Sequence, residues 1–154
     1  VPELGSSFTL SGLSTANTNC IAPNGSIDLT VIPNGAYSYL WSNNITSEDL
    51  ASLAPGIYTV TVSDVNGCSS TESFIVSDQT LQPVITETIV PSTCGNANGQ
   101  IDIAVSPAGS YLFVWSNGSA TEDLSNIPSG MYAVTVTDMN GCSEATSLVV
   151  QNTN

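Results

Sequence analysis

The sequence predicts an all-β protein made of two tandem Ig-like antiparallel β-sandwich modules. Three observations carry this prediction: an internal repeat without gaps, period-2 alternation of apolar and polar residues, and turn signals between the alternating stretches. The first module is predicted at residues 1–78 and the second at 79–154. The boundary falls near SDQTLQP, at 77–83.

The repeat has a period of 74 residues. Between Cys20 and Cys68, 24 of 49 positions are identical to those between Cys94 and Cys142, without insertion or deletion. Two copies of one module therefore account for nearly the whole chain. A module of roughly 75 residues buries a small core, so a covalent cross-link would add much to its stability.

Within the modules, short stretches alternate between apolar and polar side chains, as half-buried strands do. They are FTLSGL (8–13), SIDLTVI (26–32), AYSYLW (36–41), IYTVTVSD (57–64), STESFIV (70–76) and PVITETI (83–89). Asn-Gly and Pro-Gly pairs lie between them and indicate turns. No comparable stretch has the 3.6-residue period of an amphipathic helix.

A tyrosine corner is predicted in each module. LASLAPGIYTV places Tyr58 two residues after a glycine at the start of a Val-rich strand, and Tyr132 has the same spacing. In such a corner the hydroxyl bonds back to the loop backbone while the ring covers the core. We therefore interpret Tyr58, Tyr132, Trp41 and Trp115 as core residues and not as ligand-stacking groups.

The charge balance excludes several classes of function. The chain has 13 acidic residues and no Lys, Arg or His, for a net charge of −13. Nucleic-acid binding needs cations that neutralise phosphates, and none is present. Histidine bases, lysine Schiff bases and arginine clamps are also ruled out, so the composition indicates a protein that is not an enzyme. No apolar run is long enough to insert into a membrane.

The order of motifs resembles a known family. Both copies contain Cys…Asn-Gly-x-Ile-Asp, Trp-Ser-Asn, Glu-Asp-Leu, Gly-x-Tyr-x-Val-Thr-Val and Asp-x-Asn-Gly-Cys. This string resembles the SprB-type repeat of Bacteroidota cell-surface adhesins over the full Cys-to-Cys span of each copy. The resemblance implies a secreted, cell-surface and non-enzymatic role in very long tandem-repeat proteins. Two repeats are few for such an adhesin, so we expect a fragment or a short relative that assembles many copies.

Four cysteines occur at one spacing used twice. In a secreted context, an even number of cysteines in small β modules indicates disulfides. The duplication favours Cys20–Cys68 and Cys94–Cys142. Bonding between modules or between chains is the alternative.

The strings SDVNGC and TDMNGC have two interpretations. Asn-Gly between two strands is a strong hairpin signal. The oxygens of Asp64, Asn66, Asp138 and Asn140 also resemble the beginning of a calcium loop. Glu48-Asp49 and Glu122-Asp123 have no cationic side chain to pair with. Their alternatives are a solvated acidic loop and a shared calcium ion, so calcium is the one cofactor that we consider.

Asn24, Asn44 and Asn117 each begin an Asn-x-Ser/Thr glycosylation sequence. The expected partners are neighbouring repeats, further copies of the chain, and surface glycans. The leading segment VPELGSSFTLSGL, extended and partly apolar, predicts strand addition to a neighbour's sheet.

Together these features predict an extracellular structural or adhesive protein, and more specifically the subunit of a head-to-tail surface filament. The alternative is a carbohydrate- or calcium-binding module excised from a larger secreted adhesin or enzyme.

Overall fold

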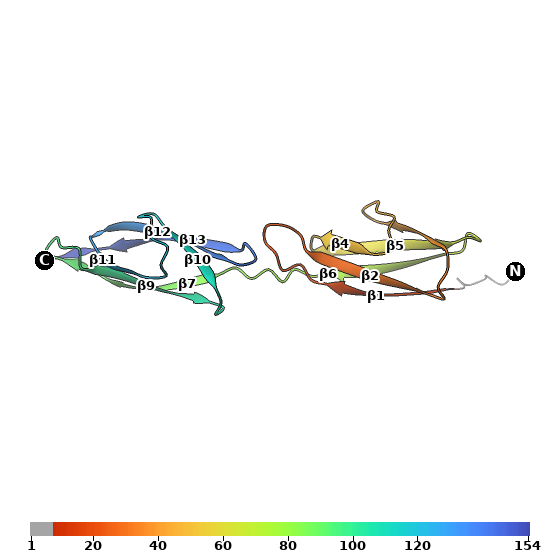
Figure 1. Cartoon of the computed structure of the whole chain (residues 1–154), viewed down its shortest axis with the longest axis horizontal. Helices are drawn as coiled ribbons and strands as arrows, with labels where there is room; N and C mark the ends of the chain where they lie inside the picture. Colours follow the sequence, from red (N-terminus) through yellow and green to blue (C-terminus); the bar gives the residue numbers. More distant parts are fainter. Residues whose placement is uncertain (1–7) are drawn as a thin grey trace. The chain divides into compact units, whose positions relative to one another are not determined.

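The computed structural model describes residues 8–154, and all regular elements in that range are β-strands (Figure 1). The chain divides into two compact units, Val1–Thr80 and Leu81–Asn154, close to the boundary predicted at 78/79. Each unit is an Ig-like β-sandwich, so the predicted fold class is confirmed.

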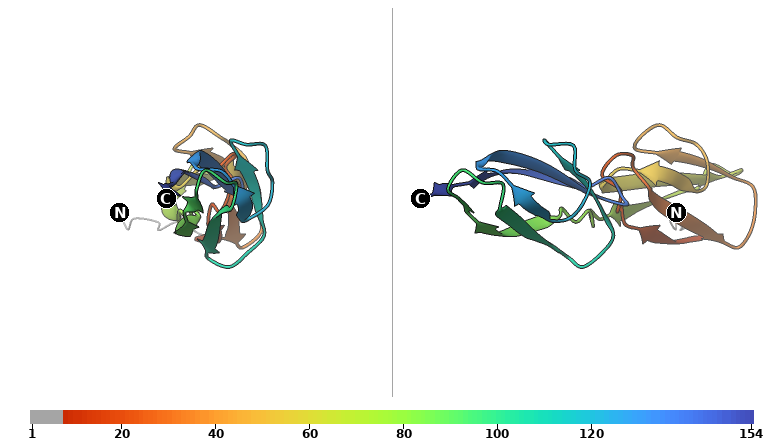
Figure 2. Two further views of the ribbon diagram at one scale, coloured as in Figure 1. Left: turned by 90° about the vertical axis from the view of Figure 1, so that its left-hand side faces the viewer. Right: turned by 60° about the vertical axis from the view of Figure 1, so that its left-hand side comes forward.

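The described part of the first unit contains two three-stranded sheets, ordered β1-β2-β4 and β3-β5-β6. The strands are Thr9–Thr15 (β1), Gly25–Ile32 (β2), Tyr37–Trp41 (β3), Leu50–Leu53 (β4), Gly56–Asp64 (β5) and Ser69–Val76 (β6). Neighbouring strands within each sheet are antiparallel. The two sheets form separate layers (Figure 2).

The second unit repeats this plan, with sheets ordered β7-β9-β11 and β10-β12-β13. Its strands are Val84–Val90 (β7), Ser92–Thr93 (β8), Gly99–Ser106 (β9), Tyr111–Trp115 (β10), Leu124–Ile127 (β11), Gly130–Asp138 (β12), Ser143–Val150 (β13) and Asn152–Thr153 (β14). The short β8 and β14 pair in parallel, which the prediction of an antiparallel sandwich did not include. The four-residue strands β4 and β11 were not predicted either.

The period-2 pattern places the core as expected. Ile27, Leu29 and Val31 of β2 are buried on one face, while Asp28 and Thr30 are exposed. Trp41 and Trp115 are only 1% and 2% exposed, and their indole nitrogens donate to the carbonyls of Ser47 and Thr121. The tryptophans are therefore core residues, as predicted, and present no platform for a sugar.

Both predicted tyrosine corners are present. The hydroxyl of Tyr58 donates to the carbonyl of Ala54 at 2.9 Å, and that of Tyr132 donates to the carbonyl of Pro128 at 2.9 Å. Each bond fixes the loop that leads into the long strand β5 or β12.

Two further tyrosines form the same type of bond at the start of β3 and β10. The hydroxyl of Tyr37 donates to the carbonyl of Pro33, four residues earlier, at 2.8 Å. Tyr111 donates to the carbonyl of Pro107. Each unit thus has two loops in which a tyrosine hydroxyl donates to the backbone carbonyl four residues before it.

The leading segment serves its own unit. Thr9 through Thr15 pair in register with Ile32 through Ser26 of β2, so this part of VPELGSSFTLSGL is a strand of the first sandwich. Strand addition to a neighbour was predicted for the whole segment, and its residues 1–7 lie outside the described residues.

Gly25 and Gly99 begin β2 and β9 at places where a side chain would not fit. A Cβ at Gly99 would lie 2.6 Å from Cγ1 of Val150 and 2.9 Å from the carbonyl oxygen of Ile127. A Cβ at Gly25 would lie 2.5 Å from Cγ1 of Val76 and 2.8 Å from the carbonyl oxygen of Leu53. The glycine of the repeated Asn-Gly motif thus allows the last long strand to pack against the start of β2 or β9.

We predict that Gly99→Ala destabilises the second unit by about 1–3 kcal/mol, because the new methyl group overlaps backbone and a buried valine. Thermal unfolding followed by calorimetry measures this. Gly109→Ala is the matched control, because its nearest neighbour would be 3.7 Å away. Equal stability of the two variants would contradict the packing described here.

Candidate functional site

In each unit the first and last strands run in the same direction. In the first unit, Asn17 just after β1 forms a parallel bridge with Asp78 just after β6. The amide of Asn17 donates to the carbonyl of Ser77, and the amide of Gln79 donates to the carbonyl of Asn17. We call the end where β1 or β7 begins the first end of a unit, and the opposite end, where the chain leaves, the last end (Figure 1).

The second unit has the same arrangement, with more regular pairing. There the parallel pair is β8 with β14, and the amides of Ser92 and Cys94 donate to the carbonyls of Gln151 and Thr153. The chain therefore enters each unit at its first end and leaves at its last end.

This arrangement separates the two cysteines of each unit. Cys68 immediately precedes β6 and lies at the first end, while Cys20 lies in the loop after β1 at the last end. The eight residues of β6 span about 23 Å between these ends. In the second unit, Cys142 precedes β13 at the first end, and Cys94 follows β8 at the last end.

The predicted disulfides Cys20–Cys68 and Cys94–Cys142 are therefore wrong. A disulfide needs Cα atoms within about 7 Å, and a strand length separates the two members of each predicted pair. Cys68 and Cys94 carry free thiols, whereas Cys20 and Cys142 are disulfide-bonded. The duplication shows that the two units carry their cysteines at equivalent positions. It does not show that the two cysteines of one unit lie close together.

The strings SDVNGC and TDMNGC form hairpin turns. Oδ1 of Asp64 accepts hydrogen bonds from the amides of Asn66 and Cys68 at 2.9 and 2.8 Å. Oδ1 of Asp138 accepts from the amides of Asn140 and Cys142, both at 2.8 Å. The aspartate thus holds the turn that carries each first-end cysteine.

The hydrogen bonds to Asp64 shift its acidity. Desolvation raises the pKa of this carboxyl, but the donated amides of Cys68 and Asn66 outweigh it, so the pKa lies below the ordinary 3.8. The charged form of Asp64 therefore stabilises the hairpin.

The acidic pairs also use their oxygens within the fold. Oδ1 of Asp49 accepts from the amide of Leu29 in β2 at 2.9 Å, and Oδ1 of Asp123 accepts from Ile103 in β9 at 3.0 Å. Glu48 faces Tyr39, and the pKa of that phenol is raised by burial and then by the charge and hydrogen bond of Glu48. Glu48 and its counterpart Glu122 are both exposed.

The candidate calcium ligands do not gather in the described part of the chain. Residues 8–154 contain no group of three or more His, Cys, Asp or Glu that could hold a metal ion. The predicted ligands Asp64, Asp138, Asp49 and Asp123 each accept backbone amides instead. Calcium binding stays a prediction from the sequence.

The three glycosylation sequences lie on exposed loops or their edges. Asn24, Asn44 and Asn117 are all exposed. The side chain of Asn24 accepts from the amide of Thr18 and donates to its hydroxyl, so a glycan there would disturb these bonds. Asn117 accepts from the amide of Ser119, and modification at any of the three stays a prediction.

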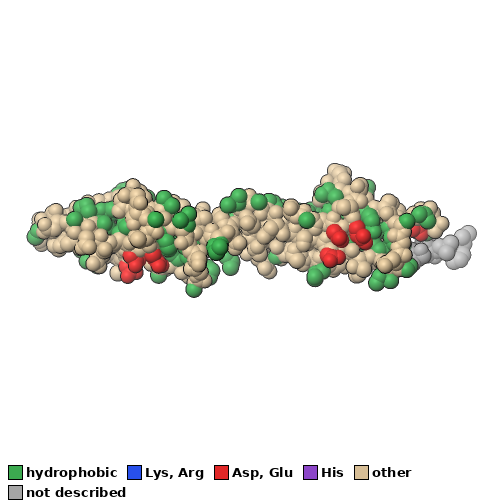
Figure 3. Space-filling model, in the orientation of Figure 1, with side chains coloured by type: hydrophobic (Ala, Val, Ile, Leu, Met, Phe, Trp, Pro, Cys, Tyr) green, Lys and Arg blue, Asp and Glu red, His purple; other side chains and the backbone are tan. Residues whose placement is uncertain are grey.

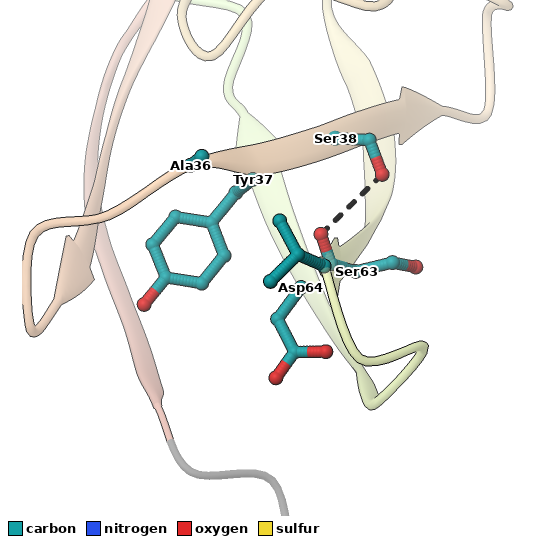
Figure 4. A pocket seen from close by; sticks show the side chains of 6 residues that line it. Ala36, Tyr37, Ser38, Ser63 and Asp64 are labelled. Carbon is teal, nitrogen blue, oxygen red and sulfur yellow. Dashed lines mark hydrogen bonds between the residues drawn. The ribbon is translucent and has the colours of Figure 1, made fainter.

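A shallow hollow of about 240 Å³ lies beside the first-end hairpin of the first unit (Figure 4). It is lined by Ala36, Tyr37, Ser38, Ser63, Asp64 and Val65. A hollow of about 250 Å³ lies at the equivalent place in the second unit. Val65 and Met139, at the two hairpin tips, are 82% and 88% exposed. The first end of each unit is thus a tip with an apolar side chain, an adjacent hollow and a cysteine.

On the face shown in Figure 3 the acidic side chains gather mainly in one group on each unit, and the sequence contains no Lys, Arg or His to pair with them. Within residues 8–154, no helix is long and apolar enough to cross a membrane.

Comparison with known proteins identifies the fold. No protein-family model matches the chain, and no curated protein matches it. The three N-terminal domains of the Highly Immunogenic Outer Capsid protein (Hoc) of bacteriophage RB49 superpose with a TM-score of 0.53 and 17% identity. The match covers 94% of this chain and 59% of the Hoc chain, so the chain spans about three fifths of that fragment.

Two further matches have lower TM-scores than Hoc. Murine CEACAM1b has a TM-score of 0.37 at 10% identity, covering 94% of this chain and 100% of that one. DIP-gamma IG1+IG2 has a TM-score of 0.41 at 9% identity, and the match covers 96% of this chain and 98% of that one.

Sequence reasoning missed the residues that join the first and last strands. Asn17 is 5% exposed, and its side chain accepts from the amide of Asn24 and donates to the carbonyl of Asn19. Ser92 is fully buried, and its backbone amide donates to the carbonyl of Gln151. These positions are not related by the 74-residue period, so the repeat gave no signal for them.

We predict that the free energy of unfolding falls less steeply with decreasing pH in Asp64→Asn than in wild type. The pKa of Asp64 is lower in the folded state than the value near 3.8 expected in the unfolded chain. Asp64 therefore stabilises the folded state at pH values above 3.8, and this stabilisation is lost as the pH falls through the lower folded-state pKa. Chemical unfolding of wild type and variant between pH 6 and pH 2 measures the difference.

The stability gap between wild type and Asp64→Asn should be largest above pH 5 and shrink below pH 4. Glu72→Gln removes an equal charge from an exposed position of β6 and serves as the control. A gap that stays constant through this pH range would contradict the role assigned to the carboxylate.

Proposed function

We propose that this chain is a non-enzymatic extracellular structural and adhesive protein whose Ig-like repeats carry tension between their two ends. The observation that carries the proposal is the position of the chain ends within each unit. The chain enters at the first end and leaves at the last end, and the strands beside these points are parallel. A pull on the chain is thus applied along the strands of the unit.

Parallel terminal strands resist such a pull through several bonds at once. Separating β8 from β14 along their length requires the bonds from Ser92 and Cys94 to break together. In the first unit the bonds from Asn17 and Gln79 are loaded in the same way. An antiparallel terminal hairpin would instead open one bond at a time.

The surface role rests on three supports. The chain resembles SprB-type adhesin repeats in its motifs. It shares its fold with domains of Hoc, which its name describes as an outer capsid protein. It contains none of the histidine, lysine or arginine side chains that most catalytic sites use.

We further propose that copies assemble end to end into a surface filament. Two gapless repeats form a head-to-tail unit, and contacts of that kind continue into fibres when they do not close. The exposed Val65 at the first end of the first unit is suited to such a contact. The charge of −13 on each copy opposes association, so screening by salt should promote it.

Force spectroscopy tests the load-bearing role. We predict that Gln79→Pro lowers the unfolding force of one of the two units, because proline cannot donate the bond to the carbonyl of Asn17. The other unit should unfold at its wild-type force. The measurement is made in reducing buffer, so that no disulfide limits the extension.

Gln79→Ala keeps the backbone N–H and is the matched control, with both units expected near wild type. An unfolding force for Gln79→Pro equal to that of Gln79→Ala would show that the terminal strands do not bear the load.

Electron microscopy tests assembly. We predict end-to-end particles at about 0.15 M salt and above, where the Debye length is about 8 Å or shorter. Val65→Asp should shorten them by adding charge at the tip. Leu40→Asp, at an exposed position of β3, should leave their length unchanged. Strictly monomeric particles at every salt and calcium concentration would rule the filament out.

A further inference from the structure

We propose that Cys94 of one copy and Cys68 of the next form a disulfide that joins copies of this chain end to end. The proposal rests on the end-to-end assembly proposed above and identifies the covalent bond that would secure it. The partner is a second copy of the same chain.

The two free thiols occupy positions suited to such a bond. Cys94 is exposed at the last end of the second unit, where its amide donates to the carbonyl of Thr153 at 2.9 Å. Cys68 is half-buried at the first end of the first unit, in the turn held by Asp64. One thiol therefore lies where the chain leaves its second unit and the other where it enters its first.

The other two cysteines show that both positions take part in disulfides. Cys20 is the counterpart of Cys94 at a last end, and Cys142 is the counterpart of Cys68 at a first end, each 74 residues away. Both Cys20 and Cys142 are disulfide-bonded in the structure. A bond from Cys94 to Cys68 would use the same two kinds of position again.

The local backbone is similar at the two first-end cysteines, Cys68 and Cys142. The amides of Cys68 and Cys142 both donate to Oδ1 of the aspartate four residues earlier, at 2.8 Å. The first-end turn therefore has the same geometry whether its cysteine is oxidised or free. The free form at Cys68 needs no rearrangement of this turn to become the bonded form.

Neither free thiol can bond to the other cysteine of its own unit, because a strand length separates Cys68 from Cys20 and Cys94 from Cys142. Cys20 and Cys142 are already bonded, so the free thiols left on each chain are Cys94 at the last end of the second unit and Cys68 at the first end of the first unit. A bond from Cys94 of one copy to Cys68 of another therefore continues from one copy to the next. Such a pattern is heterologous and leaves one free thiol at each end of a growing assembly.

The oxidation balances with a low-molecular-weight disulfide such as oxidised glutathione. The thiolate of one cysteine attacks that disulfide and releases one glutathione thiolate. The second cysteine thiolate then attacks the mixed disulfide and releases another. Two protein S–H bonds are lost, one protein S–S bond forms, and the oxidant takes up two electrons and two protons as two thiols.

The test uses the full chain in a glutathione redox buffer, analysed by non-reducing electrophoresis and by mass spectrometry of disulfide-linked peptides. Wild type should form a ladder of covalent oligomers that contains the Cys68–Cys94 peptide pair. Cys68→Ser alone and Cys94→Ser alone should each lose the ladder. Mixing these two variants should restore a covalent dimer, because each supplies the thiol that the other lacks.

The control for random collision is Glu72→Cys in a chain that also carries Cys68→Ser and Cys94→Ser. Its single free thiol lies at an exposed position in the middle of β6, and its rate of dimer formation measures the background from random collision. Three outcomes would overturn the proposal: single variants that form dimers as fast as the mixture, a mixture no faster than the background, or a monomer with Cys68 and Cys94 bonded to each other.

Microscopy of the double variant Cys68→Ser, Cys94→Ser separates this proposal from the assembly proposal. End-to-end particles of the double variant, together with no Cys68–Cys94 pair in wild type, would overturn the disulfide and leave the filament standing. Monomers of wild type and double variant under oxidising conditions would overturn both.

Discussion

The parallel course of the first and last strands determines where the ends of each repeat lie. Hydrogen bonds from Asn17 and Gln79 in one unit, and from Ser92 and Cys94 in the other, hold these strands side by side. Because the strands run the same way, the chain cannot enter and leave a unit at the same end. The direction of a pull, the separation of the cysteines and the head-to-tail character of the repeat all follow from this one constraint.

The acidic composition is compatible with this fold because several carboxylates have backbone partners. A chain without cations cannot neutralise its aspartates by salt bridges. Asp64 and Asp138 hold the first-end turns, while Asp49 and Asp123 join the loops before β4 and β11 to the central strands β2 and β9 of the same sheets. Amide donors thus stabilise charges that the sequence alone suggested as metal ligands. The repeated Asp-x-Asn-Gly-Cys string is a structural turn, and it positions a cysteine.

Much of the fold could be predicted because its signals are local. The alternation in SIDLTVI placed Ile27, Leu29 and Val31 in the core, and the spacing around Tyr58 and Tyr132 predicted two hydroxyl–carbonyl bonds. The disulfides could not be predicted, because pairing depends on which end of a strand each cysteine occupies. That depends on the parallel join at Asn17 and Ser92, for which the sequence shows no periodic signal.

The proposed end-to-end role of the chain depends most on the position of the two cysteines of each repeat at opposite ends. Digestion of the native, non-reduced protein followed by mass spectrometry of the linked peptides tests it directly. We expect no peptide pair that links Cys20 to Cys68 and none that links Cys94 to Cys142. Recovery of either pair from the folded protein would contradict the parallel arrangement of the first and last strands, which places the two cysteines of a unit at opposite ends.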